Sequence, residues 1–455
     1  MVPNEPEKKR LRDSMAVKLL VIGGLILVLL APLERVRELV REREYRGNQA
    51  SQEIAGTWGW TQVLAGPVLS IPYRYQGKDE KGKTVTWVTT AHFLPETLKV
   101  VGKVSPERRN RGLFEAAVYR ADLQVSGTFH HPAFAQWGID SKDVLWDKAS
   151  LSVGVPDLRG LRSGIGLAWG ERQLQFEPGG AKPGFWGSGL RVAVPDLQQG
   201  REGEIYAFSF GLGLNGSQKL QFLPFGKQTT VSLQAPWPSP SFSGAFLPET
   251  RRVTGMGFDA RWNVSWFARS YPQQWRDEDE TSLAPKSSLD NSAFGVDLIL
   301  PVDAYQKTER SVKYGLLFLV LTFLTFFLYE MFNPFSLHPI QYLLVGAALC
   351  LFYLLLLSFS EHIPFGYAYL IGSAATVLLI GGYSIAILRG ALRAFLMTLI
   401  LGVLYGYLYV LLKLEDYALL LGAVGLFLIL ALVMFLTRRI DWGSPRRARA
   451  AATLS

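Results

Sequence analysis

One short stretch of the sequence matches a phosphate-binding loop letter for letter. Gly77 to Thr84 reads GKDEKGKT, with Lys83 and Thr84 in the positions that would hold phosphate and magnesium. Such a loop has to open a helix, because the helix N-terminus faces the anion. The residues that follow, VTWVTTAHF, are typical of a strand. We therefore predict a charged hairpin turn here and no nucleotide site.

The histidines and acidic residues do not form a metal-binding pattern. None of the five histidines belongs to an HExxH motif or another i, i+4 pair. The acidic run RDEDET, from Arg276 to Thr281, lacks the spaced ligands and the central glycine of a calcium loop. The sequence also contains no GxSxG or SxxK motif of a hydrolase. We therefore predict no catalytic, cofactor-binding or metal-binding residues.

Four residues bracket one apolar segment and form the candidate motif of this sequence. Ile340 to Ser358 is a run of nineteen residues without a charge, close to the roughly 20 residues that cross a bilayer as a helix. His338 and Pro339 precede the run, and Glu361 and His362 follow it. We expect the two pairs to cap the helix at its two ends, with Pro339 in the first turn, where a missing N–H costs nothing.

Six segments are long and apolar enough to be transmembrane helices. Their predicted bounds are 15–33, 314–332, 340–358, 366–388, 394–412 and 417–436. Leucine-rich runs without alternation exclude barrel strands, so the spans are helical. A cleaved signal peptide is the alternative for the first segment, but VLLAPLERVRE offers no clear small-x-small cleavage site. We favour an uncleaved anchor.

The net charge of +9 is placed as in a membrane protein and does not indicate nucleic-acid binding. Basic residues cluster in the N-terminal segment 1–14 and in the tail 437–455. By the positive-inside rule, both termini of this multi-pass membrane protein are expected to be cytoplasmic. The single cysteine, Cys350, lies in a predicted span and excludes an intramolecular disulfide.

Between the first two predicted spans lies a long segment, 34–313, whose residue pattern is typical of β-strands. Runs such as KTVTWVTTAHF and ARWNVSWFARS are rich in β-branched and aromatic residues. They predict an antiparallel β-sandwich or curved sheets on the extracytoplasmic side. A charged juxtamembrane segment precedes them and is either a packed helix or a solvated stalk. FLPET occurs twice, at Phe93–Thr97 and Phe246–Thr250, and VPDL also occurs twice. These repeats indicate either a duplicated structural unit or two similar turns.

The outer segment also holds eleven of the twelve tryptophans. The two alternatives for these rings are a disulfide-free core and a stacking platform for wall glycans. Alternating positions such as Trp262 and Val264 favour the core.

The predicted helical bundle, 314–436, contains small and hydroxyl residues that bear on transport. Gly402 and Gly406 form a GxxxG pair, which favours close helix packing. A transporter or lipid-handling protein, our alternative function, needs a polar cavity at mid-membrane. The candidate hydroxyls are Ser373, Thr376, Ser384 and Thr398, for which helix–helix hydrogen bonding is the other interpretation.

Several blocks of this sequence resemble the CreD family of bacterial inner-membrane proteins. The most specific are LHPIQYLLVG at Leu337–Gly346 and FYLLLLSFSEH at Phe352–His362. The others, in family order, are AGPVLSIPY at Ala65–Tyr73, FLPE at Phe93–Glu96, WPSPSFSGAFLPE at Trp237–Glu249 and RRIDWG at Arg438–Gly443. The resemblance implies a role in cell-envelope integrity, under a two-component regulon that responds to envelope or antibiotic stress. It supplies no catalytic residues.

Together these features predict a six-span inner-membrane protein with a β-rich periplasmic domain between the first two spans. We expect it to act without catalysis in envelope maintenance or stress resistance. Its expected partners are the lipid bilayer and peptidoglycan, lipid or envelope proteins. An envelope hydrolase would instead need a cleft of perturbed carboxylates in the outer domain.

Overall fold

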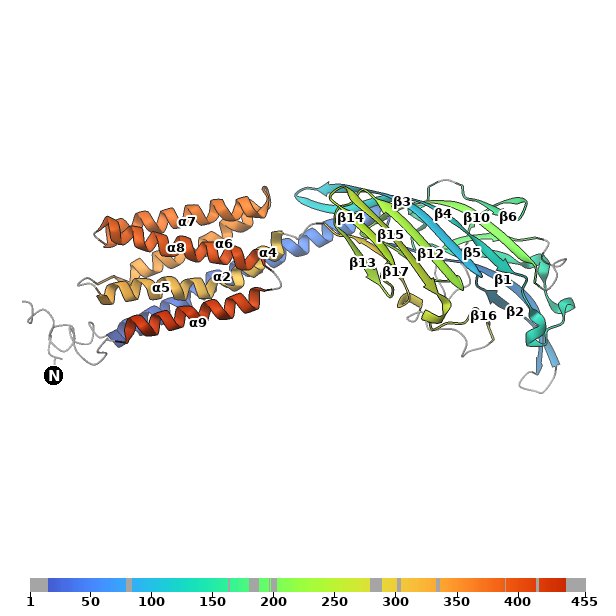
Figure 1. Cartoon of the computed structure of the whole chain (residues 1–455), viewed down its shortest axis with the longest axis horizontal. Helices are drawn as coiled ribbons and strands as arrows, with labels where there is room; N and C mark the ends of the chain where they lie inside the picture. The colour runs from blue at the N-terminus through green and yellow to red at the C-terminus, as the bar shows by residue number, and fades with distance from the viewer. Residues whose placement is uncertain are drawn as a thin grey trace, which may run out of the picture. The chain divides into compact units, whose positions relative to one another are not determined.

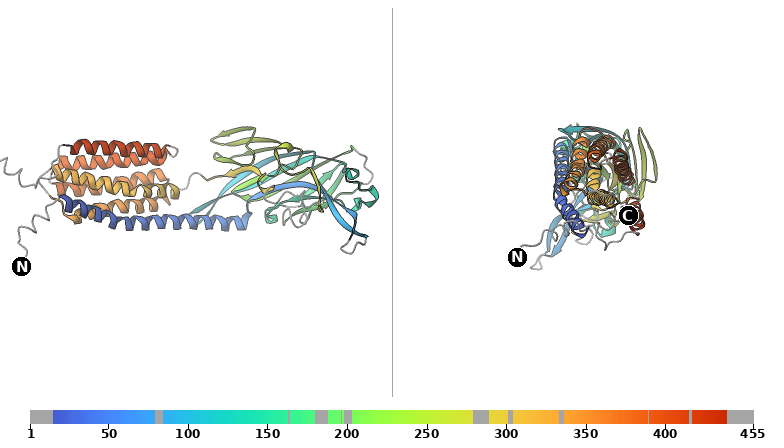
Figure 2. Two further views of the ribbon diagram at one scale, coloured as in Figure 1. Left: turned by 90° about the horizontal axis from the view of Figure 1, so that it is seen from below. Right: turned by 90° about the vertical axis from the view of Figure 1, so that its left-hand side faces the viewer.

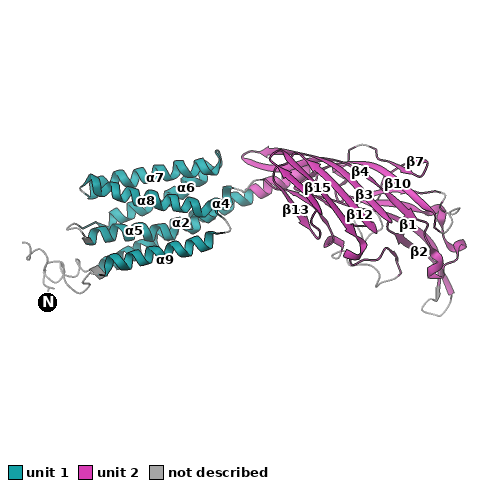
Figure 3. Ribbon diagram, in the orientation of Figure 1, with its two compact units in different colours: residues 1–46, 302–455 teal, residues 47–301 magenta. Residues whose placement is uncertain are grey.

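The computed structural model describes residues 15–78, 84–162, 164–179, 188–195, 197, 203–278, 289–300, 304–332, 336–388, 390–414 and 417–438. The chain divides into two compact units (Figure 3). The helical unit comprises Met1–Arg46 and Val302–Ser455, and the sheet unit comprises Gly47–Pro301.

The helical unit is built from seven described helices (Figures 1 and 2). They are α2 (Met15–Trp58, whose last residues belong to the sheet unit), α4 (Ala304–Lys313), α5 (Gly315–Phe332), α6 (Pro339–Ser360), α7 (Phe365–Leu388), α8 (Ala391–Lys413) and α9 (Ala418–Thr437).

Five of these helices are long and apolar enough to cross a membrane, namely α2, α6, α7, α8 and α9. A sixth span exists if α4 and α5, which are bent by 43° at Tyr314, are counted as one. Large apolar side chains face outwards from these helices: Leu419 is 87% exposed and Phe427 70%. Side chains of this kind need lipid as their solvent, which supports a membrane protein with five to six spans.

The first helix is longer than the sequence suggested. We expected a span at 15–33 followed by a separate juxtamembrane segment, either helical or solvated. The structure has one continuous helix from Met15 to Trp58. Within the helical unit, its charged part is packed and ion-paired, since Val40 is fully buried and Arg41 lies 3.3 Å from Glu309 of α4. The packed helix is therefore the better description.

Glycines bring several helices into close contact, but the GxxxG pair does not. A Cβ on Gly346 would meet Leu29 of α2 at 2.2 Å, and a Cβ on Gly381 would meet Thr398 of α8 at 2.5 Å. Gly402 and Gly406 have no neighbouring atom within 4 Å of a built Cβ. Our expectation that this pair packs the bundle is wrong, because the face of α8 that carries it is exposed.

The sheet unit consists of two sheets. The nine-stranded sheet has the order β13-β17-β11-β1-β5-β9-β8, with β2 on β1 and β16 on β2, and the eight-stranded sheet has the order β14-β15-β12-β3-β4-β10-β6-β7. The strands are β1 (Gln62–Lys78), β2 (Thr84–Phe93), β3 (Thr97–Arg111), β4 (Phe114–His130), β5 (Ser150–Gly154), β6 (Gly166–Trp169), β7 (Arg172–Gln175), β8 (Glu177–Pro178), β9 (Gly189–Ala193), β10 (Ile205–Ser217), β11 (Lys219–Phe222), β12 (Gln228–Ala235), β13 (Pro240–Gly244), β14 (Thr250–Thr254), β15 (Gly257–Ser265), β16 (Gln274–Arg276) and β17 (Phe294–Leu298).

Alternating burial places one hydrophobic core between these sheets. In β3 and β15 every second side chain is buried, as the period of a strand requires. Ile71 of the nine-stranded sheet and Val100 of the eight-stranded sheet belong to the same buried cluster. The sequence predicts an antiparallel sandwich or curved sheets. The structure differs from a purely antiparallel sandwich in two places, because β1 pairs with β11 and β3 pairs with β12 in parallel. Crossing between the sheets allows these parallel pairs.

Each of the repeated FLPET motifs connects a strand of one sheet to a hairpin of the other. The first connects β2 of the nine-stranded sheet to the hairpin β3–β4 of the eight-stranded sheet. The second connects β13 of the nine-stranded sheet to the hairpin β14–β15 of the eight-stranded sheet. Each hairpin is followed by a short 3-10 helix, at Phe134–Trp137 and Trp266–Ala268. The surroundings differ, because β3 lies inside its sheet between β12 and β4, whereas β14 lies at the edge, so the likeness covers the connection and the hairpin and leaves both interpretations open.

The tryptophans divide between the core and the surface. Trp262 is fully buried and Trp237 is 5% exposed, and their indole N–H groups donate to the carbonyl oxygens of Phe246 and Ile299. Trp60 remains 43% exposed. Burial of the largest rings supports the core interpretation for Trp237 and Trp262.

Candidate functional site

His338 and Pro339 begin helix α6, as the sequence predicts. The Nδ1 atom of His338 accepts from the backbone N–H of Ile340 at 3.4 Å, and Gln341 Oε1 accepts from the backbone N–H of His338 at 2.9 Å. These two bonds form a capping box, with Pro339 in the first turn. The imidazole thus satisfies helix N–H groups that would otherwise lack partners.

Glu361 and His362 end the same helix, and Glu361 joins three segments of the helical unit. Its side chain is 10% exposed. Its Oε1 accepts from the hydroxyl of Tyr305 in α4 at 3.2 Å and lies 3.7 Å from Nε of Arg43 in α2. His362 is exposed, and its backbone N–H donates to the carbonyl of Phe359. The structure does not bring the two pairs together, because the 22 residues of α6 span about 33 Å.

A buried ion pair lies at the other end of the helical unit, and sequence analysis missed it. Lys18 of α2 pairs with Glu330 of α5, whose side chain is only 3% exposed. Ser336 Oγ lies 2.6 Å from Lys18 Nζ, and the Tyr342 hydroxyl donates to Glu330 Oε2 at 3.2 Å. Ser336 and Tyr342 flank the His338–Pro339 pair, so the start of α6 contacts both members of the ion pair. The sequence did contain a signal for this pair. Lys18 and Glu330 have opposite charges and lie at the ends of two predicted spans that face the same side of the membrane in the predicted topology.

The four hydroxyl residues singled out in the sequence bond within their own helices. Ser373 donates to Leu370 and Thr376 to Gly372 in α7. Ser384 likewise donates to Ile380, and Thr398 of α8 donates to Ala394. All four hydroxyl hydrogens that we considered for a transport cavity or for helix–helix bonds are thus donated to carbonyl oxygens of the same helix.

The sheet unit contains a serine, a histidine and an aspartate in one hydrogen-bonded row. Nδ1 of His92 lies 2.8 Å from Ser70 Oγ, and Nε2 lies 2.9 Å from Asp277 Oδ1. The His92 ring also stacks on Trp275 at a centroid distance of 5.1 Å. Ser70 and His92 are directly opposite in the β1–β2 pair, whereas Asp277 follows β16, 185 positions after His92. No sequence motif could have indicated this arrangement.

The geometry of this row fits a structural role better than nucleophilic catalysis. Ser70 sits inside a strand that is paired on both sides, with His92 in β2 and Ser150 in β5. Its backbone is therefore part of the sheet and not the exposed turn that usually presents a nucleophile beside an oxyanion hole. His92 is 6% exposed and Trp275 5%. The row fastens β1, β2 and the end of β16 to one another.

The other chemically suggestive motifs have structural roles where they are described. β1 and β2 pair as a hairpin up to Lys78 and Thr84, so Thr84 begins a strand, and the phosphate-loop interpretation is excluded by topology. Residues 79–83, which include Lys83, lie outside the described residues. His130 lies 3.8 Å from Glu96, and Nδ1 of His131 lies 3.2 Å from the Tyr206 hydroxyl. Within the described ranges no cluster of three or more His, Cys, Asp or Glu side chains has the arrangement of a metal site.

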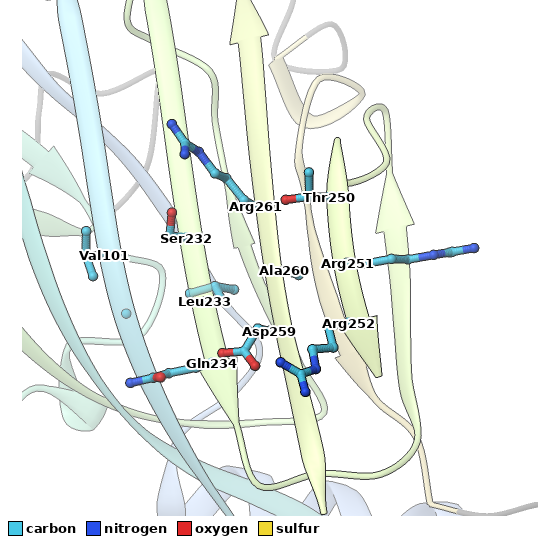
Figure 4. A pocket seen from close by; sticks show the side chains of 11 residues that line it. Val101, Ser232, Leu233, Gln234, Thr250, Arg251, Arg252, Asp259, Ala260 and Arg261 are labelled. Carbon is cyan, nitrogen blue, oxygen red and sulfur yellow. The ribbon is translucent and has the colours of Figure 1, made fainter. Parts of the chain in front are cut away.

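The outer face of the eight-stranded sheet carries an open groove of about 410 Å³ (Figure 4). It crosses strands β3, β12, β15 and β14, and we call it the arginine groove. Its lining includes Ser232, Gln234 and Thr250 as short polar side chains and Arg251, Arg252, Arg261 and Asp259 as charged ones. The three arginines are exposed, and they take part in no ion pair among the residues that the structure describes. Arg252 and Arg261 together with Asp259 leave the groove face with a net positive charge, which makes it attractive to negative charge.

The register of the strands explains how the groove acquires its charge. Arg252 of β14 is directly opposite Asp259 of β15, and Thr250 is opposite Arg261. These residues alternate with buried positions such as Ala260 and Trp262, so they share the solvent face of the sheet. Figure 4 shows Arg252 and Asp259 extending into the same part of the groove, whereas Arg251 extends away from it.

The chain matches the family model described as inner membrane protein CreD over residues 14–443. It is also 34% identical over 439 residues to the inner membrane protein CreD of Escherichia coli (strain K12), and the match covers 95% of this chain and 94% of that protein. Both matches include the sheet unit and the helical unit.

Solved structures give much weaker likenesses. Two structures of a mutant M1 zinc metallopeptidase from Deinococcus radiodurans match with TM-scores of 0.23 and 0.19 and identities of 12% and 13%. They cover 45% and 38% of this chain and 42% and 38% of the peptidase chains. Scores this low carry no argument about fold or activity.

Proposed function

Because this chain belongs to the CreD family of inner membrane proteins, we propose that it acts in cell-envelope maintenance, without catalysis, by binding a negatively charged envelope component through its sheet unit. The resemblance to CreD motifs supports the envelope role. The long apolar segments of the sequence and the exposed apolar faces of the helices support a place in the inner membrane.

The arginine groove is the observation that carries this proposal. Arg252 and Arg261 are exposed on its face, and its hydroxyl and amide side chains leave room for a ligand of several atoms. Guanidinium groups recognise phosphate and carboxylate oxygens with paired hydrogen bonds. A phosphate- or carboxylate-bearing component of the envelope is therefore the ligand class that the groove suits.

The topology that goes with this role places the sheet unit in the periplasm and both termini in the cytoplasm. The basic segments 1–14 and 437–455 support cytoplasmic ends, and the span bounds from the sequence remain part of the proposal. In this arrangement Glu361 lies at the periplasmic end of its helix and the Lys18–Glu330 pair lies at the cytoplasmic end.

Complementation tests whether the groove matters for the envelope. In cells that lack the protein, the variant with both Arg252→Ala and Arg261→Ala should leave the envelope permeable to a dye that an intact envelope excludes. The matched control is Arg172→Ala, which removes an exposed arginine at the opposite end of the same sheet. Full restoration of the barrier by the groove variant, at wild-type protein levels, would refute binding through this groove.

A further inference from the structure

Strand β14 is an open edge of the eight-stranded sheet. It stands at the end of the strand order and pairs only with β15. All five of its residues, Thr250 to Thr254, are exposed. An edge of this kind presents unpaired backbone N–H and C=O groups to any extended chain that approaches it.

The other strands at sheet ends are less suited to accept a partner. β8 has two residues and contains proline, and β16 has three. β13 also begins with a proline, and four of its five residues are partly covered. β7 has four residues and does not contribute to the arginine groove. Among these end strands, β14 thus combines an edge that is exposed over its full length with a charged groove beside it.

The hairpin geometry identifies the backbone groups that face outwards. Thr254 and Gly257 close a two-residue turn, so they form a hydrogen-bonded pair. Such pairs alternate along an antiparallel ladder. Arg252 and Thr250 therefore bond to β15, whereas the N–H and C=O groups of Arg251 and Val253 point away from it, towards the open edge.

Charge decides which chain fits this edge. An added strand would run beside two adjacent arginines of β14, one on each face. Its side chains on the groove face would lie next to Arg252, with Arg261 one strand further across the groove. A second copy of β14 would bring arginines against arginines, which is unfavourable for cross-strand neighbours. An acidic strand would find a cation on each face.

We propose that β14 accepts an extended acidic segment of another polypeptide, which adds to the eight-stranded sheet as a further strand and places carboxylates in the arginine groove. This inference rests on the proposed binding role of the sheet unit and names the class of partner. The backbone bonds supply affinity, and the arginines supply selectivity for acidic sequences.

The test measures binding of a labelled peptide of alternating threonine and glutamate to the full chain in detergent, by fluorescence anisotropy. We expect saturable binding, and we expect an alternating threonine–lysine peptide of the same length to bind at least about tenfold more weakly. Arg252→Glu together with Arg261→Glu should reverse that preference. Equal binding of both peptides to the wild type would overturn the proposal.

Val253→Pro separates strand addition from simple charge attraction. Proline at this position removes an outward N–H, spares the ladder to β15 and keeps all three arginines, and edge strands tolerate it for that reason. It should weaken acidic-peptide binding at least about tenfold. The control Gln173→Pro, on the edge strand β7, should leave binding unchanged. Unchanged binding by Val253→Pro would overturn strand addition while leaving the proposed envelope role standing, because that role is tested by complementation.

Discussion

At the scale of single residues, the structure concentrates its polar chemistry in two buried sites. Glu330 is held by Lys18 and Tyr342 in the helical unit. His92 is held by Ser70 and Asp277 in the sheet unit. A buried polar group costs free energy unless its partners are present, so each site should reveal itself when one partner is removed.

Replacing Glu330 with alanine should destabilise the helical unit by about 3 kcal/mol or more, because Lys18 is then left without its carboxylate. Cys350, the single cysteine, is buried in this unit, so its reaction with a thiol-reactive dye during heating reports unfolding. The variant should react at a lower temperature than the wild type.

The matched control is the double variant Lys18→Met and Glu330→Leu, which removes both charges. It should recover most of the lost stability, since an apolar pair can replace a buried ion pair at little cost. If the single and the double variant unfolded at the same temperature, leaving Lys18 without its carboxylate would cost no stability, and the ion pair would contribute nothing beyond the volume of its side chains.

Replacing His92 with alanine should destabilise the sheet unit by about 2–4 kcal/mol, because it leaves a cavity beside Trp275 and removes one hydrogen-bond partner of Asp277. Ser70→Ala should cost only about 1 kcal/mol. Tryptophan fluorescence during urea unfolding measures both, since eleven of the twelve tryptophans lie in residues 34–313. Covalent labelling of Ser70 by a fluorophosphonate would contradict the structural role and indicate a hydrolase.

At the scale of elements, the end of α2 is fastened to the sheet unit by the first VPDL motif. Asp157 accepts from the backbone N–H of Trp60 at 3.1 Å and from Nε of Arg159 at 2.9 Å. Arg159 in turn donates to the carbonyl of Gly56 in the last turns of α2. In the second VPDL motif, residue 196 lies outside the described residues, so the comparison of the two motifs remains a sequence observation.

The Asp157 contacts predict how acid weakens this joint. Burial alone would raise the pKa of Asp157, but bonds from the Arg159 side chain and from the backbone N–H groups of Trp60 and Arg159 outweigh it and lower the pKa. A carboxyl with a lowered pKa stabilises the fold above its unfolded pKa of about 4, and this stabilisation is lost as the pH falls through the folded value.

The variant Asp157→Asn should therefore be about 2 kcal/mol less stable than the wild type at pH 7. The difference should shrink below about pH 4, where the wild-type carboxyl becomes protonated. Unfolding of both proteins, followed by tryptophan fluorescence at several pH values, measures it. A difference that stayed constant into strong acid would mean that the charge of Asp157 is irrelevant.

At the scale of the whole molecule, the proposed topology makes a prediction for each side of the membrane. Reporters that are active only in the periplasm should give signal after Gly200, Pro364 and Asp416, and no signal after Arg393 and Gly443. The reason is the alternation of spans between basic cytoplasmic segments. Because α4 and α5 are bent by 43°, the fusion after Gly443 tests in particular whether they cross together as one span. Signal there would make the number of spans odd.

The sequence by itself determined the elements whose signal is local. Long apolar runs marked the candidate spans, LHP marked the start of α6, and alternating β-branched residues marked the sheet unit. These signals are readable because helix length, capping and strand periodicity depend on residues that are close together in the chain.

Only the tertiary structure decided which distant residues meet. Lys18 and Glu330 are 312 positions apart, and His92 and Asp277 are 185 apart. The arginine groove is assembled from four strands of one sheet, between which the chain passes through the other sheet. Strand pairing and helix packing, not sequence neighbourhood, set these contacts. The same reason explains the exposed GxxxG face of α8. A pattern of small residues indicates that another helix can approach closely, but it does not indicate which face the neighbouring helices cover.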